Sequence, residues 1–213
     1  MNKMSETTRK LVTCGVLIAL GTILSMIKFS DLPFGGSVTL FSMVPMVVLG
    51  YKYGIKWGLF SGLIFSALQA ILGATTSHAF AGVTGWSVVA MAFLDYIVAF
   101  TVLGLSGMFK NKIKNHTAAI TTGAIVVVML RFVSHFASGW ILWGSYAEGW
   151  FADLNSAFGE KVLATYSGQA LSALYSFVYN GSYMIPELIL TVIGVVALMA
   201  IKPVRKLIVN KNA

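Results

Sequence analysis

The feature that most constrains this chain is a long stretch without formal charge. Residues 57–94 contain no Asp, Glu, Lys or Arg. A single helix of that length would measure roughly 57 Å, well beyond the ~30 Å hydrocarbon core of a bilayer. The stretch divides at 73–85, where Gly, Thr, Ser and Ala predominate, into two segments that can each cross a membrane once. The sequence therefore predicts an integral membrane protein.

Composition and the remaining apolar runs lead to an all-α fold. Hydrophobic residues make up 57% of the chain and charged residues 10%, whereas soluble domains carry about 25% charged residues. Uncharged runs elsewhere complete a set of six transmembrane helices with no separate soluble domain. We place these spans in a single domain over residues 1–213, at about 11–27, 38–50, 57–72, 86–109, 117–142 and 171–201.

The distribution of charge sets the expected orientation. All but Lys28, Arg131 and Lys161 of the 15 basic residues fall in segments that share the side of the N-terminus. Because basic residues concentrate on the cytoplasmic side of membrane proteins, we expect both termini in the cytoplasm. The net charge of +8 then reflects topology and needs no nucleic-acid partner.

The fifth span carries polar residues on one helix face. Arg131, His135, Ser138 and Gly139 recur at helical spacing, and Trp143 extends the same stripe, whereas Trp140 points elsewhere. Ionisable residues within a membrane span commonly mark a functional site. We therefore interpret the stripe from His135 to Trp143 as a ligand wall.

Asp95 and His135 are expected at similar depths. They lie roughly 13 and 10 Å along their helices from Trp86 and Leu142, which mark the outer ends. A carboxylate and an imidazole can then share one outward-facing cavity. The alternatives are a structural ion pair between Asp95 and Arg131, and an interhelical hydrogen bond for His135.

The sixth span adds hydroxyl and amide groups. Tyr175 and Tyr179 recur at helical spacing, and Asn180 follows directly. Such groups supply oriented donors and acceptors in an apolar site, although tyrosines also gather at membrane interfaces. Glu187, next to Pro186, is either part of the site or a partner for a basic residue.

Together these groups suit a small, flat, polar aromatic ligand of cationic character. Cys14 is the chain's one cysteine, and its three histidines, His78, His116 and His135, lack metal-ligand spacing. A membrane enzyme for lipid or isoprenoid substrates would need clustered carboxylates or paired histidines. A channel would need a polar stripe through the full membrane depth. We therefore expect no metal site, no catalytic residues and no enzyme.

The chain also resembles a known family over nearly its whole length. Four segments in order carry the resemblance: PFGGSVTLFSMVPM at 33–46, LDYIVAFTVLGLSGMF at 94–109, RFVSHFASGWILWGSYA at 131–147 and YSFVYNGSYMIP at 175–186. They are similar to the thiamine-specific S components (ThiT family) of energy-coupling-factor (ECF) vitamin transporters. These are multi-pass proteins of the bacterial plasma membrane that bind thiamine outside the cell with high affinity and deliver it inward.

The resemblance implies a thiamine pocket near the outer side. Trp143 and His135 would stack on the rings of thiamine, and the Asp95 carboxylate would bond the aminopyrimidine or compensate the cationic charge. An S component for another vitamin is the closest rival. The binding positions that carry over are Asp95, Tyr96, His135, Gly139, Trp143, Tyr175 and Asn180.

One departure concerns the segment before the proline of the second span. Some family members have a tryptophan and a glutamate there, and the corresponding positions in this chain are Gly36 and Leu40. The loop from Gly35 to Thr39 must therefore close the pocket differently.

The resemblance also implies partner subunits. S components dock, through small residues on the first helix, on a transmembrane coupling subunit that is joined to two ATPases. The corresponding pair here is Gly15 and Ala19; packing within this protein is the alternative. The chain has no phosphate-binding loop motif, so we expect ATP to be used by the partners and no cofactor in this chain.

Overall fold

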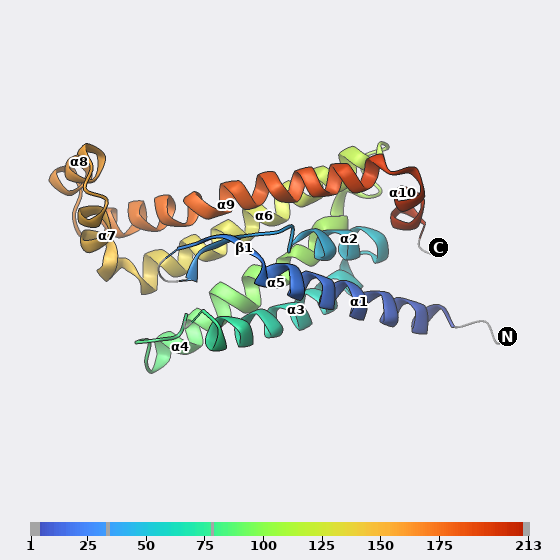
Figure 1. Cartoon of the computed structure of the whole chain (residues 1–213), viewed down its shortest axis with the longest axis horizontal. Helices are drawn as coiled ribbons and strands as arrows, with labels where there is room; N and C mark the ends of the chain where they lie inside the picture. Colours follow the sequence, from blue (N-terminus) through green and yellow to red (C-terminus); the bar gives the residue numbers. More distant parts are fainter. Residues whose placement is uncertain (1–4, 33–34, 78, 211–213) are drawn as a thin grey trace.

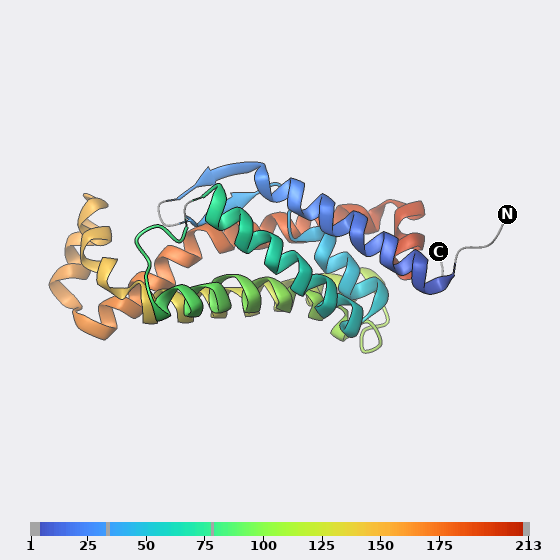
Figure 2. The ribbon, with the colours of Figure 1, turned by 90° about the horizontal axis from the view of Figure 1, so that it is seen from below.

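The computed structural model describes residues 5–32, 35–77 and 79–210. It is an elongated bundle of helices that run roughly along one axis (Figures 1 and 2). In the described part of the chain, five helical spans are long and apolar enough to cross a membrane. They are α1 (Glu6–Met26), α3 (Ile55–Thr75), the span Trp86–Phe109, α6 (His116–Leu142) and α9 (Gly168–Ala200). The predicted all-α membrane fold is thus confirmed.

Two of the long helices begin at polar N-cap residues, and the long helices carry exposed apolar side chains on their outer faces. The Ser5 hydroxyl and the Asn115 side chain cap α1 and α6 by accepting backbone N–H groups at 3.1 Å. Val16 on α1 is 62% exposed and Ile185 on α9 is 61% exposed. Such faces are expected to lie against acyl chains.

The second span differs from the predicted helix over 38–50. The segment after α1 folds into an antiparallel hairpin of β1 (Lys28–Asp31) and β2 (Ser37–Thr39). A turn with φ +56° at Phe41 leads into α2 (Val44–Tyr53), whose first turn contains Pro45. All ten residues of α2 are buried, and its length of about 15 Å covers half a bilayer core. In the described part of the chain, five long spans and one short buried helix therefore stand where six transmembrane helices, the second of them short, were expected.

The fourth span is continuous but irregular. It comprises α4 (Trp86–Met91), the π-helical η2 (Ala92–Val98), α5 (Ala99–Thr101) and the 3₁₀-helical η3 (Val102–Phe109). Asp95 and Tyr96 both lie in the π-helical segment. π-Helical turns are rare, and many of those known lie at functional sites. Asp95 and Tyr96 are therefore candidates for a functional role.

Glycines let α3 approach the fourth span closely. A Cβ atom at Gly58 would lie 2.2 Å from the carbonyl oxygen of Gly104. This contact is closer than any side chain permits, so both positions require glycine.

The two ends of the bundle differ. The start of α1, the end of α2 and α10 (Lys202–Val209) lie at one end (Figure 1). The other end carries α7 (Ala147–Asp153) and α8 (Ala157–Thr165), joined to α6 through η4 (Gly144–Tyr146). The segment 144–168 is therefore largely helical, and Phe151 within it is buried.

Candidate functional site

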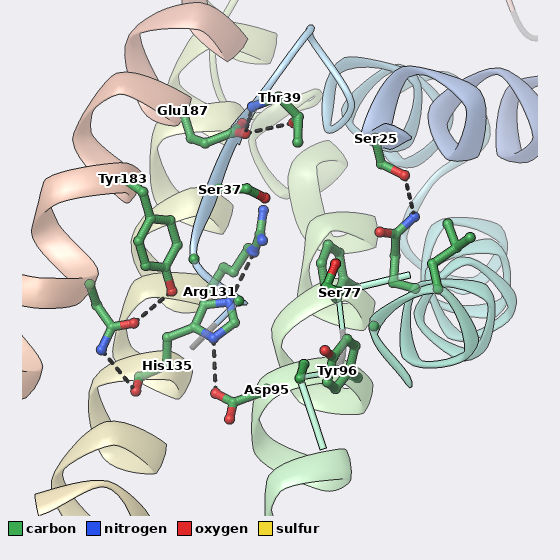
Figure 3. A pocket seen from close by; sticks show the side chains of 18 of the residues that line it. Ser25, Ser37, Thr39, Ser77, Asp95, Tyr96, Arg131, His135, Tyr183 and Glu187 are labelled. Carbon is green, nitrogen blue, oxygen red and sulfur yellow. Dashed lines mark hydrogen bonds and ion pairs between the residues drawn. The ribbon is translucent and has the colours of Figure 1, made fainter. Parts of the chain in front are cut away.

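A cavity of about 370 Å³ lies in the half of the bundle away from α10. Residues of α1, the β1–β2 hairpin, α3, the fourth span, α6 and α9 line it (Figure 3). The structure brings to this cavity all seven residues that the sequence analysis placed in a binding site: Asp95, Tyr96, His135, Gly139, Trp143, Tyr175 and Asn180.

Asp95 and His135 form the polar centre of one wall. Oδ1 of Asp95 lies 3.0 Å from Nδ1 of His135, and the Ser138 hydroxyl donates to Oδ2 at 2.6 Å. Arg131 donates from Nε to Nε2 of His135 at 3.2 Å. That bond requires a lone pair on Nε2, so Nδ1 carries the proton and donates it to Asp95. Both ring nitrogens of His135 are therefore occupied, and its ring also meets the Tyr183 ring edge-on, with centroids 6.0 Å apart.

Arg131 does not form the alternative ion pair with Asp95 in the described part of the chain. Its guanidinium carbon lies 4.2 Å from the centre of the Phe100 ring, and Nη1 lies 3.0 Å from the sulfur of Met43. In Figure 3 the guanidinium extends toward Ser37 and away from Asp95. A cation on a desolvated aromatic face is stabilised there.

Glu187 belongs to the cavity lining and also fastens the hairpin. Its side chain is almost fully buried. Oε1 accepts the backbone N–H and the hydroxyl of Thr39 at 2.5 and 2.6 Å. Pro186 leaves α9 continuous. The sequence left the role of Glu187 open, and the structure makes it the contact between α9 and β2.

Asn180 is held by neighbours within the bundle. Its amide nitrogen donates to the carbonyl oxygens of His135 and Ser176, and its oxygen accepts the Tyr183 hydroxyl at 2.6 Å. A Cβ atom at Gly139 would lie 2.3 Å from the Ser176 hydroxyl. Gly139 therefore permits the close packing of α6 on α9, in addition to lining the cavity.

The aromatic lining comes from several elements. Trp143 caps the C-terminus of α6, and its backbone N–H donates to the carbonyl oxygen of Gly139 at 3.2 Å. Trp140 is 41% exposed and donates to Gln169, which confirms that it points away from the ligand wall. Tyr175 is buried against Trp150, with ring centres 5.5 Å apart. Tyr96 stacks on Phe80 with ring centres 5.4 Å apart.

The sequence analysis did not identify several lining residues. Tyr183 extends the Tyr175–Tyr179 stripe by one more helical turn, so the spacing contained the signal. The loop from Gly35 to Thr39 was expected to close the pocket, and Gly35, Gly36, Ser37 and Thr39 do line the cavity. Gly36 donates its N–H to the Tyr179 hydroxyl at 3.1 Å, and a Cβ there would lie 2.8 Å from the Tyr183 ring. The hairpin can therefore lie directly on these tyrosines only because position 36 lacks a side chain.

Two further expectations concern other parts of the chain. Gly15 and Ala19 lie on the exposed face of α1, and a Cβ atom at Gly15 would meet nothing within 4 Å. Neither residue packs inside the protein. Among the described residues, no group of three or more His, Cys, Asp and Glu side chains is arranged to hold a metal ion. His78 lies outside the described residues.

Comparison with known proteins identifies the family. The model of the family described as thiamine transporter protein (Thia_YuaJ) matches residues 11–159. The chain belongs to this family. Its members are transporters and not enzymes, and the chain is accordingly a multi-pass protein of the bacterial plasma membrane.

Relatives of this family member match over much of their length. The thiamine transporter ThiT of Bacillus subtilis (strain 168) is 28% identical, and the match covers 95% of this chain and 96% of that protein. ThiT of Lacticaseibacillus paracasei is 24% identical over 76% of this chain and 73% of its own. A solved structure of ThiT from Listeria monocytogenes superimposes with a TM-score of 0.68 at 22% identity, covering 96% of this chain and 99% of that one. This last likeness supports the fold.

Proposed function

We propose that this chain is the thiamine-binding S component of an ECF-type ABC transporter. It takes up thiamine from the outside with high affinity and delivers it inward together with the energy-coupling module. The observation that carries the proposal is the convergence of Asp95, His135 and Trp143 on one cavity in a member of the thiamine transporter family.

The cavity offers what thiamine requires. The indole of Trp143 and the imidazole of His135 both line the cavity and can stack on its two rings, and a cationic thiazolium gains from an aromatic face. Asp95 has one donor on each oxygen. Because each carboxylate oxygen has two acceptor sites, Asp95 can still accept a hydrogen bond from the aminopyrimidine or balance the cation. Tyr96, Tyr175 and Asn180 fix the orientation of the ligand through hydrogen bonds.

The orientation follows from charge. Lys52 and Lys110 donate to backbone carbonyls of α10, which itself contains Arg205, and basic residues favour the cytoplasmic side. Both termini are then cytoplasmic, and the cavity lies in the outer half of the membrane.

A fluorescence titration tests the ligand. Thiamine should quench the tryptophan fluorescence of the purified protein at low concentration, because a stacked ligand contacts the Trp143 indole. Trp143→Phe should remove most of the quench. Trp140→Phe is the matched control and should leave the quench intact, because Trp140 faces away from the cavity. Quenching by riboflavin or biotin without a response to thiamine would refute the proposed ligand.

The partners proposed are a transmembrane coupling subunit and two ATPases. Gly15 and Ala19 form a flat strip on the exposed face of α1, where a partner helix can approach closely. Gly15→Leu and Ala19→Leu should spare thiamine binding and abolish co-purification with the coupling module. Gly181→Leu on α9, where a Cβ also meets nothing within 4 Å, is the control. Survival of the complex in both α1 variants would refute docking through this strip.

A further inference from the structure

Glu187 and Arg131 place two opposite charges in the lining of the cavity. Figure 3 shows Glu187 beside Thr39 at one end, Asp95 at the other, and the guanidinium of Arg131 between them. Glu187 is 1% exposed, Arg131 is 8% exposed, and both line the cavity. They are close enough to interact electrostatically, but no ion pair joins them in the described part of the chain.

Each of these groups has an unused polar atom. Oε2 of Glu187 has no hydrogen-bond partner, although Oε1 accepts two donors from Thr39. Arg131 uses Nε and Nη1, on His135 and Met43, and its Nη2 donates to no acceptor among the described residues. A buried charge without a direct partner is costly. The opposite charges of Glu187 and Arg131 therefore stabilise each other across the cavity.

We propose that Glu187 sets the charge of this end of the cavity and thereby selects against phosphorylated ligands. The inference rests on the proposed function. Thiamine carries one hydroxyl, on its ethyl side chain, and its phosphate esters form at that oxygen. With one ring against Trp143 and the other against His135, beside Asp95, the hydroxyethyl group of thiamine extends toward Arg131. The guanidinium offers a donor to the hydroxyl oxygen.

The charge of the Glu187 carboxylate determines which ligand groups can bind beside Arg131. Without it, a buried guanidinium facing a cavity is an anion site, because arginine binds phosphate strongly through paired donors. With it, the two charges offset each other, and a phosphate dianion placed beside Arg131 meets the repulsion of Glu187. A neutral hydroxyl meets no such repulsion. The free alcohol is therefore favoured over its monophosphate.

The test compares two ligands in matched variants. We expect Glu187→Gln, which preserves shape and an oxygen for Thr39, to improve the affinity for thiamine monophosphate relative to thiamine by roughly tenfold or more. Arg131→Gln should shift the same ratio in the opposite direction. Thr39→Val, which removes one bond to Glu187 without removing its charge, should leave the ratio unchanged. Thermal unfolding of each variant verifies that it is folded.

The outcomes separate the possible roles of Glu187. If Glu187 only fastens the hairpin, Glu187→Gln will change both affinities equally, and an unchanged ratio overturns the proposal. An unchanged ratio in Arg131→Gln would overturn it equally. The unmodified protein reports on the proposed function by itself. Absence of thiamine binding there refutes that function and this proposal with it, whereas an unchanged ratio in a thiamine-binding protein refutes this proposal alone.

Discussion

Asp95 and His135 lie on different helices, 40 residues apart in the sequence, and their carboxylate and imidazole meet at 3.0 Å. Arg131 donates a hydrogen bond to Nε2 of His135, so the proton of the neutral imidazole lies on Nδ1, which faces Asp95. The contact also keeps a carboxylate in the wall of a cavity that a cationic ligand can enter. The predictions below follow from this arrangement and from the packing that supports it.

We predict that Asp95→Asn weakens thiamine binding by about 30-fold or more. The substitution keeps the shape of the side chain but removes the charge that faces the ligand. Loss of one member of a buried charged pair typically costs at least about 2 kcal/mol. Isothermal titration calorimetry of the purified protein measures the change. Ser138→Ala is the control, because it removes one donor to Asp95 and leaves the charge in place. An equal loss in the two variants would contradict a direct role for the charge.

Gly139→Ala should destabilise the protein by about 1 to 3 kcal/mol through overpacking. The new methyl group would lie 2.3 Å from the Ser176 hydroxyl, so α6 and α9 would have to separate. Thermal unfolding in detergent measures the effect. Adding Ser176→Gly should restore much of the stability, and Gly181→Ala, which meets nothing within 4 Å, should have little effect. A stable Gly139→Ala variant would show that the helices separate at little cost.

The hairpin should depend on Gly36. In Gly36→Ala the methyl group would lie 2.8 Å from the Tyr183 ring and 2.9 Å from the Tyr179 hydroxyl. The hairpin must then lift from the cavity, and we expect thiamine to dissociate faster. Stopped-flow fluorescence measures the dissociation rate, with Ser37→Ala as the control. An unaltered rate would mean that the hairpin does not cover the bound ligand.

At the opposite end of the bundle, Lys52 should anchor α10. Its ammonium donates to the backbone carbonyls of Leu207 and Asn210, and hydrogen bonds to a charged group contribute about 1.5 to 3 kcal/mol. In Lys52→Met the amides of α10 should exchange with solvent at least about tenfold faster, because their helix opens more often. The exposed Lys56 supplies the control, Lys56→Met. Equal exchange in the two variants would refute the anchor.

The features that follow from the regular spacing of residues along a helix were predicted well from the sequence. The common depth of Asp95 and His135 was inferred from the rise of an α-helix, and the two side chains do meet at 3.0 Å, although Asp95 lies in a π-helical segment. The same regularity separated Trp143 from Trp140. Apolar runs without charge located the membrane-crossing segments for a related reason, because the bilayer tolerates few charges.

The features that sequence reasoning missed depend on contacts between distant segments. The segment 38–43 is mostly apolar like the helical segment that follows it, and nothing in its pattern shows that strand β2 ends at Thr39. The bond from Thr39 to Glu187 joins residues 148 positions apart, and no periodicity encodes it. The π-helical turn at Asp95 and Tyr96 likewise has no recognisable spacing.

The most direct test of the thiamine site is a crystal structure of the protein bound to thiamine. We predict density for the ligand in the cavity between η2, α6 and α9, with one ring against Trp143, the other against His135, and the Asp95 carboxylate in contact. Thiamine bound elsewhere on the protein, or an empty cavity in crystals saturated with thiamine, would contradict the site.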